Sequence, residues 1–134
     1  MEPTFDHEKL KAYQASLRFY SWCEVILERV AKTFAVRDQL ERARTSIALS
    51  IAEGNGKFTR PDRCRFFGIA RGSALESAAC LDLLQLRGVL QPEETSTGKA
   101  ELKGIVSMLV GLVRSNSSDR MYEELVPYRI GERE

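Results

Sequence analysis

Four cationic side chains lie within nine residues of this sequence, between positions 57 and 65. They are Lys57, Arg60, Arg63 and Arg65, and Asp62 is the one acidic residue among them. The Gly-Asn-Gly stretch at 54–56 and the start of the helix expected after it offer backbone N–H groups at the same corner. Cations and helix N-termini both attract phosphate groups. We therefore expect a nucleic-acid contact surface here, with further contacts from Arg37 and Arg44.

Two other interpretations of this basic cluster remain open. It could be a solvated turn, or it could form ion pairs with another subunit. Phe58, inside the cluster, could stack on a nucleobase, although an isolated aromatic side chain in a loop usually packs locally.

Positive charge is concentrated in the middle of the chain. Residues 36–71 carry eight basic and four acidic side chains, whereas residues 1–35 carry five of each and residues 72–134 carry seven basic and ten acidic ones. The net charge of the 134 residues is only +1. Attraction for a polyanion must therefore come from the local excess and not from a global field.

Two carboxylates, Glu53 and Glu76, are the other candidate chemical groups. Helical spacing places Glu53 on a polar line beside an apolar stripe, and it places Glu76 at the edge of a face of small residues. A carboxylate near a core edge needs a cation, so we expect both to pair with basic residues, and Arg42 is the first choice. We interpret the line as a structural polar network, whose members are Arg42, Ser46, Ser50, Glu53 and Glu76.

The sequence contains few of the residues and motifs that are typical of enzyme active sites. It contains one histidine, and two carboxylates without histidine do not make the usual helical di-metal site. Its three cysteines form no CxxC pair, and it has no glycine-rich phosphate loop, HExxH or GxSxG motif. We expect no catalytic residues, no metal and no cofactor.

Apolar residues repeat at intervals of three and four over long segments, which predicts an all-α fold. Four helices are expected, at 7–32, 36–54, 61–87 and 93–114, and a start of the fourth near Thr97 is the alternative. Their stop and start signals are Asp6 as an N-cap, the glycines of 54–56, Pro61, and Gly88.

Comparable helix lengths and short connections favour an antiparallel up-down four-helix bundle over residues 1–114. Residues 115–134 are charged, contain Pro127, and are expected to form a flexible tail. No run of 18 apolar residues could cross a membrane, and the acidic N-terminus lacks the core of a secretory signal. We therefore expect a protein without a secretory signal that does not contact a membrane.

Apolar side chains of the first and third expected helices spread over more than one side. The third helix carries Phe66, Phe67, Leu81, Leu83, Leu84 and Leu86. Self-association would bury such surplus apolar surface, so we expect a homo-oligomer. A monomer that hides all of it is the alternative.

Two segments together resemble a known family. They read RARTSIALSIAEG at residues 42–54 and RFFGIARGSALE at residues 65–76, with the basic cluster between them. The pair is similar to the motifs of the four-helix bundle family named after proteins encoded in intervening sequences of 23S ribosomal RNA genes, over about residues 8–114. Ser50 stands where that family usually has Asn, and Lys57 stands where Arg is common.

The resemblance implies a bacterial, cytoplasmic, up-down bundle that assembles into a ring-shaped homopentamer and has no enzymatic activity. Accessory proteins of diversity-generating retroelements are similar in fold, and they bind nucleic acid and a reverse transcriptase. In a ring of five copies, the local excess of four positive charges in each copy would become a basic ring.

These observations lead to two functional hypotheses. The first is a non-catalytic homo-oligomer that binds RNA or DNA through phosphates, without sequence preference. The alternative is a protein scaffold or accessory module, for example for a reverse transcriptase, without direct nucleic-acid binding. Its docking face would be the acidic C-terminal half or an outer line of the third helix, made of Arg71, Leu75, Ala78 and Asp82.

Overall fold

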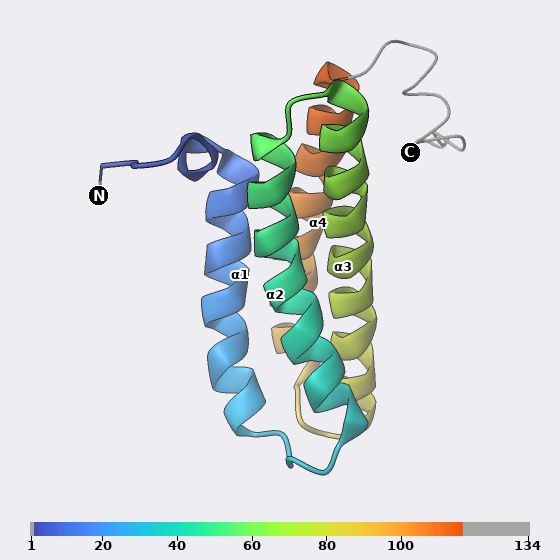
Figure 1. Cartoon of the computed structure of the whole chain (residues 1–134). Coiled ribbons are helices and arrows are strands. Elements are labelled where there is room, and N and C mark those ends of the chain that lie inside the picture. The colour runs from blue at the N-terminus through green and yellow to red at the C-terminus, as the bar shows by residue number, and fades with distance from the viewer. Residues whose placement is uncertain (1, 117–134) are drawn as a thin grey trace.

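The computed structural model describes residues 2–116 as four packed α-helices preceded by one short 3-10 turn. The elements are η1 (Asp6–Lys9), α1 (Lys11–Glu28), α2 (Ala35–Gly56), α3 (Arg60–Leu86) and α4 (Pro92–Ser115), and no strand occurs among the described residues. The helices run alternately up and down, so each is antiparallel to the next (Figure 1). The predicted all-α four-helix bundle is thus confirmed.

The first helix is shorter than the predicted 7–32, because its N-terminal part forms a separate turn. Glu8 accepts hydrogen bonds from the backbone N–H groups of Thr4 and Phe5, which closes η1, and Leu10 is extended. Asp6 accepts a hydrogen bond from Asn55 Nδ2 at 3.0 Å and does not cap α1. At the other end α1 stops at Glu28, but the apolar pattern continues because Val30 is buried beyond the helix end.

α2 continues two residues beyond the predicted 54 and ends at Gly56, so Gly54 lies inside the helix and not at its end. A Cβ at Gly54 would lie 2.9 Å from Phe67 Cε1 and 3.0 Å from Phe66 Cβ, so this glycine allows α2 and α3 to approach closely. Gly88, by contrast, has a φ of +79°, and it follows α3 as a C-terminal stop, as predicted.

The fourth helix starts at Pro92, so the alternative start near Thr97 is wrong. Pro92 suits the first helical position, which needs no N–H donor. Glu94 closes the start of the helix by accepting a hydrogen bond from the backbone N–H of Gln91 at 2.9 Å.

All four helices contribute to one core. Its largest fully buried side chains include Phe19, Leu40, Ile47, Phe67, Leu84, Ile105 and Leu109. The most extensive helix contact joins α2 and α3. These two helices therefore form a closely packed helical hairpin. The cluster of cations at 57–65 lies at the turn of this hairpin.

The tail predicted at 115–134 falls mostly outside the described residues. Ser115 is the last residue of α4, and Asn116 follows it. No helix in the part of the chain that the structure describes is long and apolar enough to cross a membrane.

Candidate nucleic-acid interface

The turn between α2 and α3 gathers four of the predicted contact residues in one place. Only residues 57–59 connect the two helices, at the upper end of the bundle in Figure 1. Thr59 caps α3 by accepting a hydrogen bond from the Asp62 N–H at 3.3 Å, and Pro61 occupies its first turn. We call Lys57, Arg60, Arg63 and Arg65, beside this helix N-terminus, the basic corner.

Arg63 fixes the shape of this corner. Its Nη1 donates to the carbonyl oxygens of Asn55 at 2.8 Å and Lys57 at 3.2 Å. Its Nε donates to Asn116 Oδ1 at 2.9 Å, which ties the corner to the end of α4. The half-buried guanidinium therefore supplies charge to the corner while most of its donors are occupied.

Two more cations are held by one aromatic ring. Lys57 Nζ lies 4.8 Å and Arg65 Cζ 4.6 Å from the centroid of Phe66. Such cation–π contacts restrain the long side chains without neutralising their charge. Arg60 is exposed and forms no ion pair with the described residues, so it is free to meet a ligand.

Phe58 projects from the middle of the basic corner. Phe58 is 103% exposed, so none of the residues that the structure describes shields the ring. The expectation that an aromatic residue in this loop packs locally is therefore wrong.

Arg44 is buried and lies apart from the basic corner. Its side chain is only 4% exposed, and it forms ion pairs with Glu24 at 2.8 Å and Glu41 at 2.6 Å. It also donates to the Tyr20 carbonyl at 2.8 Å and lies 3.7 Å above the Tyr20 ring. Burial by itself lowers the pKa of Arg44, but the hydrogen bonds that Arg44 donates to the carboxylates of Glu24 and Glu41 raise it overall. Arg44 thus joins α1 to α2, and the structure does not expose it beside the four cations of the basic corner.

Arg37 lies far from the basic corner. It occupies the first turn of α2, whereas Lys57 follows the last turn, and a helix of this length spans about 30 Å. Arg37 is half-buried and donates from Nε to the Leu27 carbonyl at 3.3 Å. The structure therefore does not bring Arg37 together with the other four cations.

Within the described residues, the predicted polar network has one side-chain hydrogen bond, that of Ser46, and its partner Ser73 is not a predicted member. Ser73 Oγ donates to Ser46 Oγ at 2.8 Å across α2 and α3, and Ser50 is buried. Arg42, Glu53 and Glu76 are exposed, and within residues 2–116 none of them forms an ion pair. The prediction that Glu53 and Glu76 pair with Arg42 is therefore wrong within one chain.

Those three charged residues share one outward surface with exposed apolar residues. The helical intervals of three, four and seven residues align them in two lines, and the Ser46–Ser73 bond lies between the lines. We call this surface the α2–α3 face; its exposed members are Arg42, Leu49 and Glu53 on α2, and Ile69, Gly72, Glu76 and Leu83 on α3.

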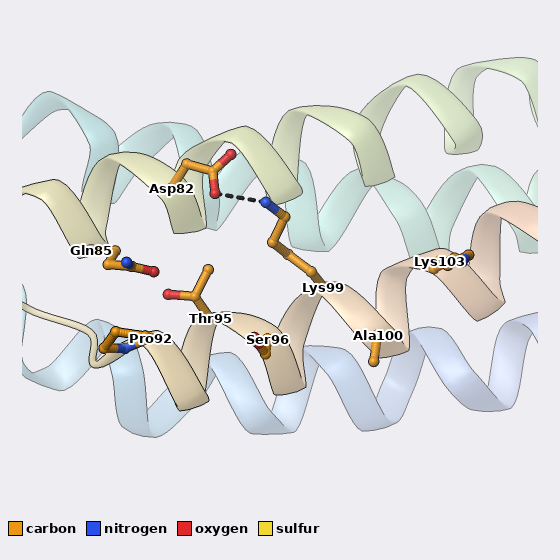
Figure 2. A pocket seen from close by; sticks show the side chains of 8 residues that line it. All are labelled: Asp82, Gln85, Pro92, Thr95, Ser96, Lys99, Ala100 and Lys103. Carbon is orange, nitrogen blue, oxygen red and sulfur yellow. Dashed lines mark hydrogen bonds and ion pairs between the residues drawn. The ribbon is translucent and has the colours of Figure 1, made fainter.

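A groove of about 470 Å³ between α3 and α4 is a weaker candidate site (Figure 2). Lys99 Nζ and Asp82 Oδ1 are 2.8 Å apart there, so their charges offset each other. Lys103 lies farther along α4 and forms no ion pair with any described residue. The groove therefore does not concentrate charge of one sign as the basic corner does.

Metal-ligating side chains and the three cysteines are the remaining chemical features of the described part of the chain. No three His, Cys, Asp or Glu side chains within it are placed to hold a metal ion. Burial raises the pKa of Cys23 to about 12 and that of Cys80 to about 11. Both thiols are therefore protonated, and poor nucleophiles, near neutral pH.

Sequence reasoning missed the two asparagines that anchor Arg63. The Gly-Asn-Gly stretch draws attention to Asn55, but nothing in the sequence indicates that its carbonyl accepts a hydrogen bond from Arg63. Asn116 is 53 residues from Arg63, and no local pattern could reveal that contact.

Comparison with known proteins places this bundle among its relatives. The model of the family described as 23S rRNA-intervening sequence protein matches residues 8–111. The fold is similar to the crystal structure of a protein of unknown function from the S23 ribosomal protein family of Bacteroides thetaiotaomicron. The two have a TM-score of 0.72 and 23% sequence identity, over 77% of this chain and 98% of the other. None of the curated proteins compared with this chain matches it.

Proposed function

This chain belongs to the family of 23S rRNA-intervening sequence proteins, and we propose that it is a non-catalytic homo-oligomer that binds RNA or DNA through its basic corner. The proposed assembly is a ring, with five copies as its expected number, in the cytoplasm of a bacterium. Binding is to phosphates, without sequence preference. The observation that carries the proposal is the convergence of Lys57, Arg60, Arg63 and Arg65 at one helix turn.

The electrostatics of the corner favour a polyanion. Glu53 and Asp62 are the acidic side chains nearest in sequence, so the four cations outnumber them by two. The start of α3 adds the positive end of a helix dipole. Three of the cations are held by rings or hydrogen bonds, so less side-chain freedom is lost when a phosphate binds.

Self-association through the α2–α3 face would strengthen this attraction. The face carries exposed charges of both signs, in Arg42, Glu53 and Glu76, beside exposed Leu49 and Ile69. A second copy can supply complementary charges to such a surface and cover its apolar residues. The basic corner lies at one end of the same pair of helices. This packing would therefore bring the basic corners of neighbouring copies close together, and their electric fields would add.

The direct test is the affinity for a fluorescently labelled 20-nucleotide RNA, measured by anisotropy at several salt concentrations. The double variant Arg60→Glu/Arg65→Glu should bind at least about tenfold more weakly than the unaltered protein, and its affinity should depend less on salt. Both side chains are exposed, so folding should persist.

A matched control reverses two exposed cations away from the corner, in Lys32→Glu/Lys103→Glu. It has the same net charge as the corner variant, and we expect it to bind within about threefold of the unaltered protein. Equal losses in the two double variants, or an affinity that does not change with salt, would refute the proposal.

A scaffold for another protein is the second candidate. Leu75, Leu83 and Leu86 are exposed on α3 and could dock a partner such as a reverse transcriptase. A complex with a purified reverse transcriptase that survives nuclease treatment and the corner charge reversal would favour this function over the first.

A further inference from the structure

We infer that Phe58 is a stacking platform for an unpaired nucleobase, which makes the basic corner selective for single-stranded over duplex nucleic acid. The inference rests on the proposed function and specifies its ligand. It starts from the position of one bare aromatic ring among four cations.

The exposure of Phe58 exceeds that of every other large apolar side chain described. Its 103% compares with 83% for Leu86 and 63% for Phe5. Burying a phenylalanine stabilises a fold, and no described residue covers this ring. Phe58 also has no ring or cation contact with the described residues.

The backbone on both sides of Phe58 is held in place. The Lys57 N–H donates to the Gly54 carbonyl at 3.2 Å, and the Lys57 carbonyl accepts from Arg63. Thr59, the next residue, caps α3. The ring is therefore presented from a fixed turn, so little backbone freedom is lost when a ligand stacks on it.

The neighbouring cations suit the backbone of the same ligand. Lys57 and Arg65 are restrained over the ring of Phe66, which leaves Phe58 as the free aromatic side chain of the corner. Arg60, two residues from Phe58, is exposed and free to meet a phosphate. An aromatic ring for a base with cations for the phosphates is the combination that binds single strands without sequence preference.

Duplex nucleic acid cannot use the ring in this way. Its bases are paired and stacked on one another, and they present only their edges in the grooves. Duplex would therefore meet only the cations of the corner. A second copy of the chain covering Phe58 is the competing occupant, and the experiment below distinguishes it.

The experiment compares a labelled 15-nucleotide oligo(U) with a 15-base-pair duplex at one salt concentration. Phe58→Ala and Phe58→Leu should each weaken single-strand binding by about fivefold or more, because the stacking surface is lost. Duplex binding should stay within about twofold, and Phe58→Trp should retain single-strand affinity. Leu86→Ala, at the other end of α3, is the control for an exposed apolar residue and should bind as the unaltered protein does.

Three results would overturn the inference. Equal losses for both probes would make Phe58 a general contact, and a Phe58→Leu variant with full affinity would exclude stacking. A fall in native mass for Phe58→Ala would assign the ring to an interface between copies. If binding depends on Arg60 and Arg65 but not on Phe58, only the stacking inference fails; if the unaltered protein binds neither probe, the proposed function fails with it.

Discussion

Several charged residues on the α1–α4 side of the bundle pair with each other, whereas those on the α2–α3 face form no ion pair within residues 2–116. Arg18 meets Glu101 at 3.3 Å, and Arg29 meets Glu94 at 2.6 Å and also donates to the Val89 carbonyl. On the α2–α3 face, Arg42, Glu53 and Glu76 form no ion pair with residues 2–116. Two ion pairs therefore join charged residues on the α1–α4 side within one copy, although Lys103 has no partner there, whereas all three charged residues of the α2–α3 face lack one among the described residues.

The same contrast between residues with and without a partner in the chain occurs within the two segments that carry the family resemblance. Their small residues have a role inside the chain, because Gly54 packs against Phe67 and Ser46 bonds to Ser73. Their charged residues at 42, 53 and 76 have no such role in one copy. We attribute them to contact with another copy, which is the central claim of the proposed assembly.

Charge reversal on the two sides should have very different effects, and this is the largest effect we predict. Arg42→Glu should weaken self-association by at least about tenfold at each interface, since like charges facing each other across an interface cost several kcal/mol. Arg18→Glu, which breaks the exposed pair with Glu101, should leave the native mass unchanged and cost less than about 1 kcal/mol of folding stability. Sedimentation over a concentration series measures the first effect, and urea unfolding measures the second. Equal native masses for both variants would contradict the claim that only the α2–α3 face contacts another copy.

A methyl group at Gly54 should disturb the α2–α3 packing. Gly54→Ala places a Cβ within 3.0 Å of two buried or half-buried phenylalanines, and we expect a destabilisation of about 1–3 kcal/mol in urea unfolding. The matched control is Gly104→Ala on α4, where a Cβ meets nothing within 4 Å. Higher helix propensity should make the control as stable as the unaltered protein or more so. A stabilised Gly54→Ala variant would show that the close approach is not required.

A substitution at Gly72 can distinguish an effect on the stability of the single chain from an effect on self-association. A Cβ there meets nothing within 4 Å in one copy, as at Gly104, so both alanine variants should gain up to about 1 kcal/mol of chain stability. Only Gly72 lies on the α2–α3 face. Gly72→Ala should therefore weaken self-association measurably while Gly104→Ala does not. Identical native-mass profiles for the two variants would place the interface elsewhere.

The pair between Arg29 and Glu94 should have the smallest effect, and that effect should depend on pH. A hydrogen bond from Arg29, and a second from the Gln91 N–H, lower the pKa of Glu94 from 4.5 to about 2. A carboxylate with a lowered pKa stabilises the fold fully above its ordinary value, and the contribution is lost as pH falls towards the lowered one. Glu94→Gln should thus lower the Tm slightly at pH 6–7, and the difference should shrink below pH 4.5. Both side chains are partly exposed, so added salt should reduce it. A difference in Tm that stayed constant down to pH 2 would contradict this assignment.

The sequence predicted the architecture well because a long amphipathic helix repeats its signal many times. All four helices, the Gly88 stop and the position of the basic corner follow from periodicity and turn residues. Single side chains were harder to place. Helical spacing puts Arg44 beside the core stripe, but only the tertiary contact with Tyr20 and Glu24 shows that it is buried. Arg42 and Glu76 could be matched by charge, yet charge alone does not tell whether the partner is in the same copy.

The most direct test of the central claim is the native mass of the protein at micromolar concentration, after nuclease treatment and with absorbance at 260 nm recorded. We predict a mass about five times that of the 15.1 kDa chain, unchanged by nuclease, with absorbance from nucleic acid lost on treatment. A single species of 15.1 kDa would mean that the α2–α3 face is not covered by another copy, and it would remove the basis for adding the fields of several basic corners.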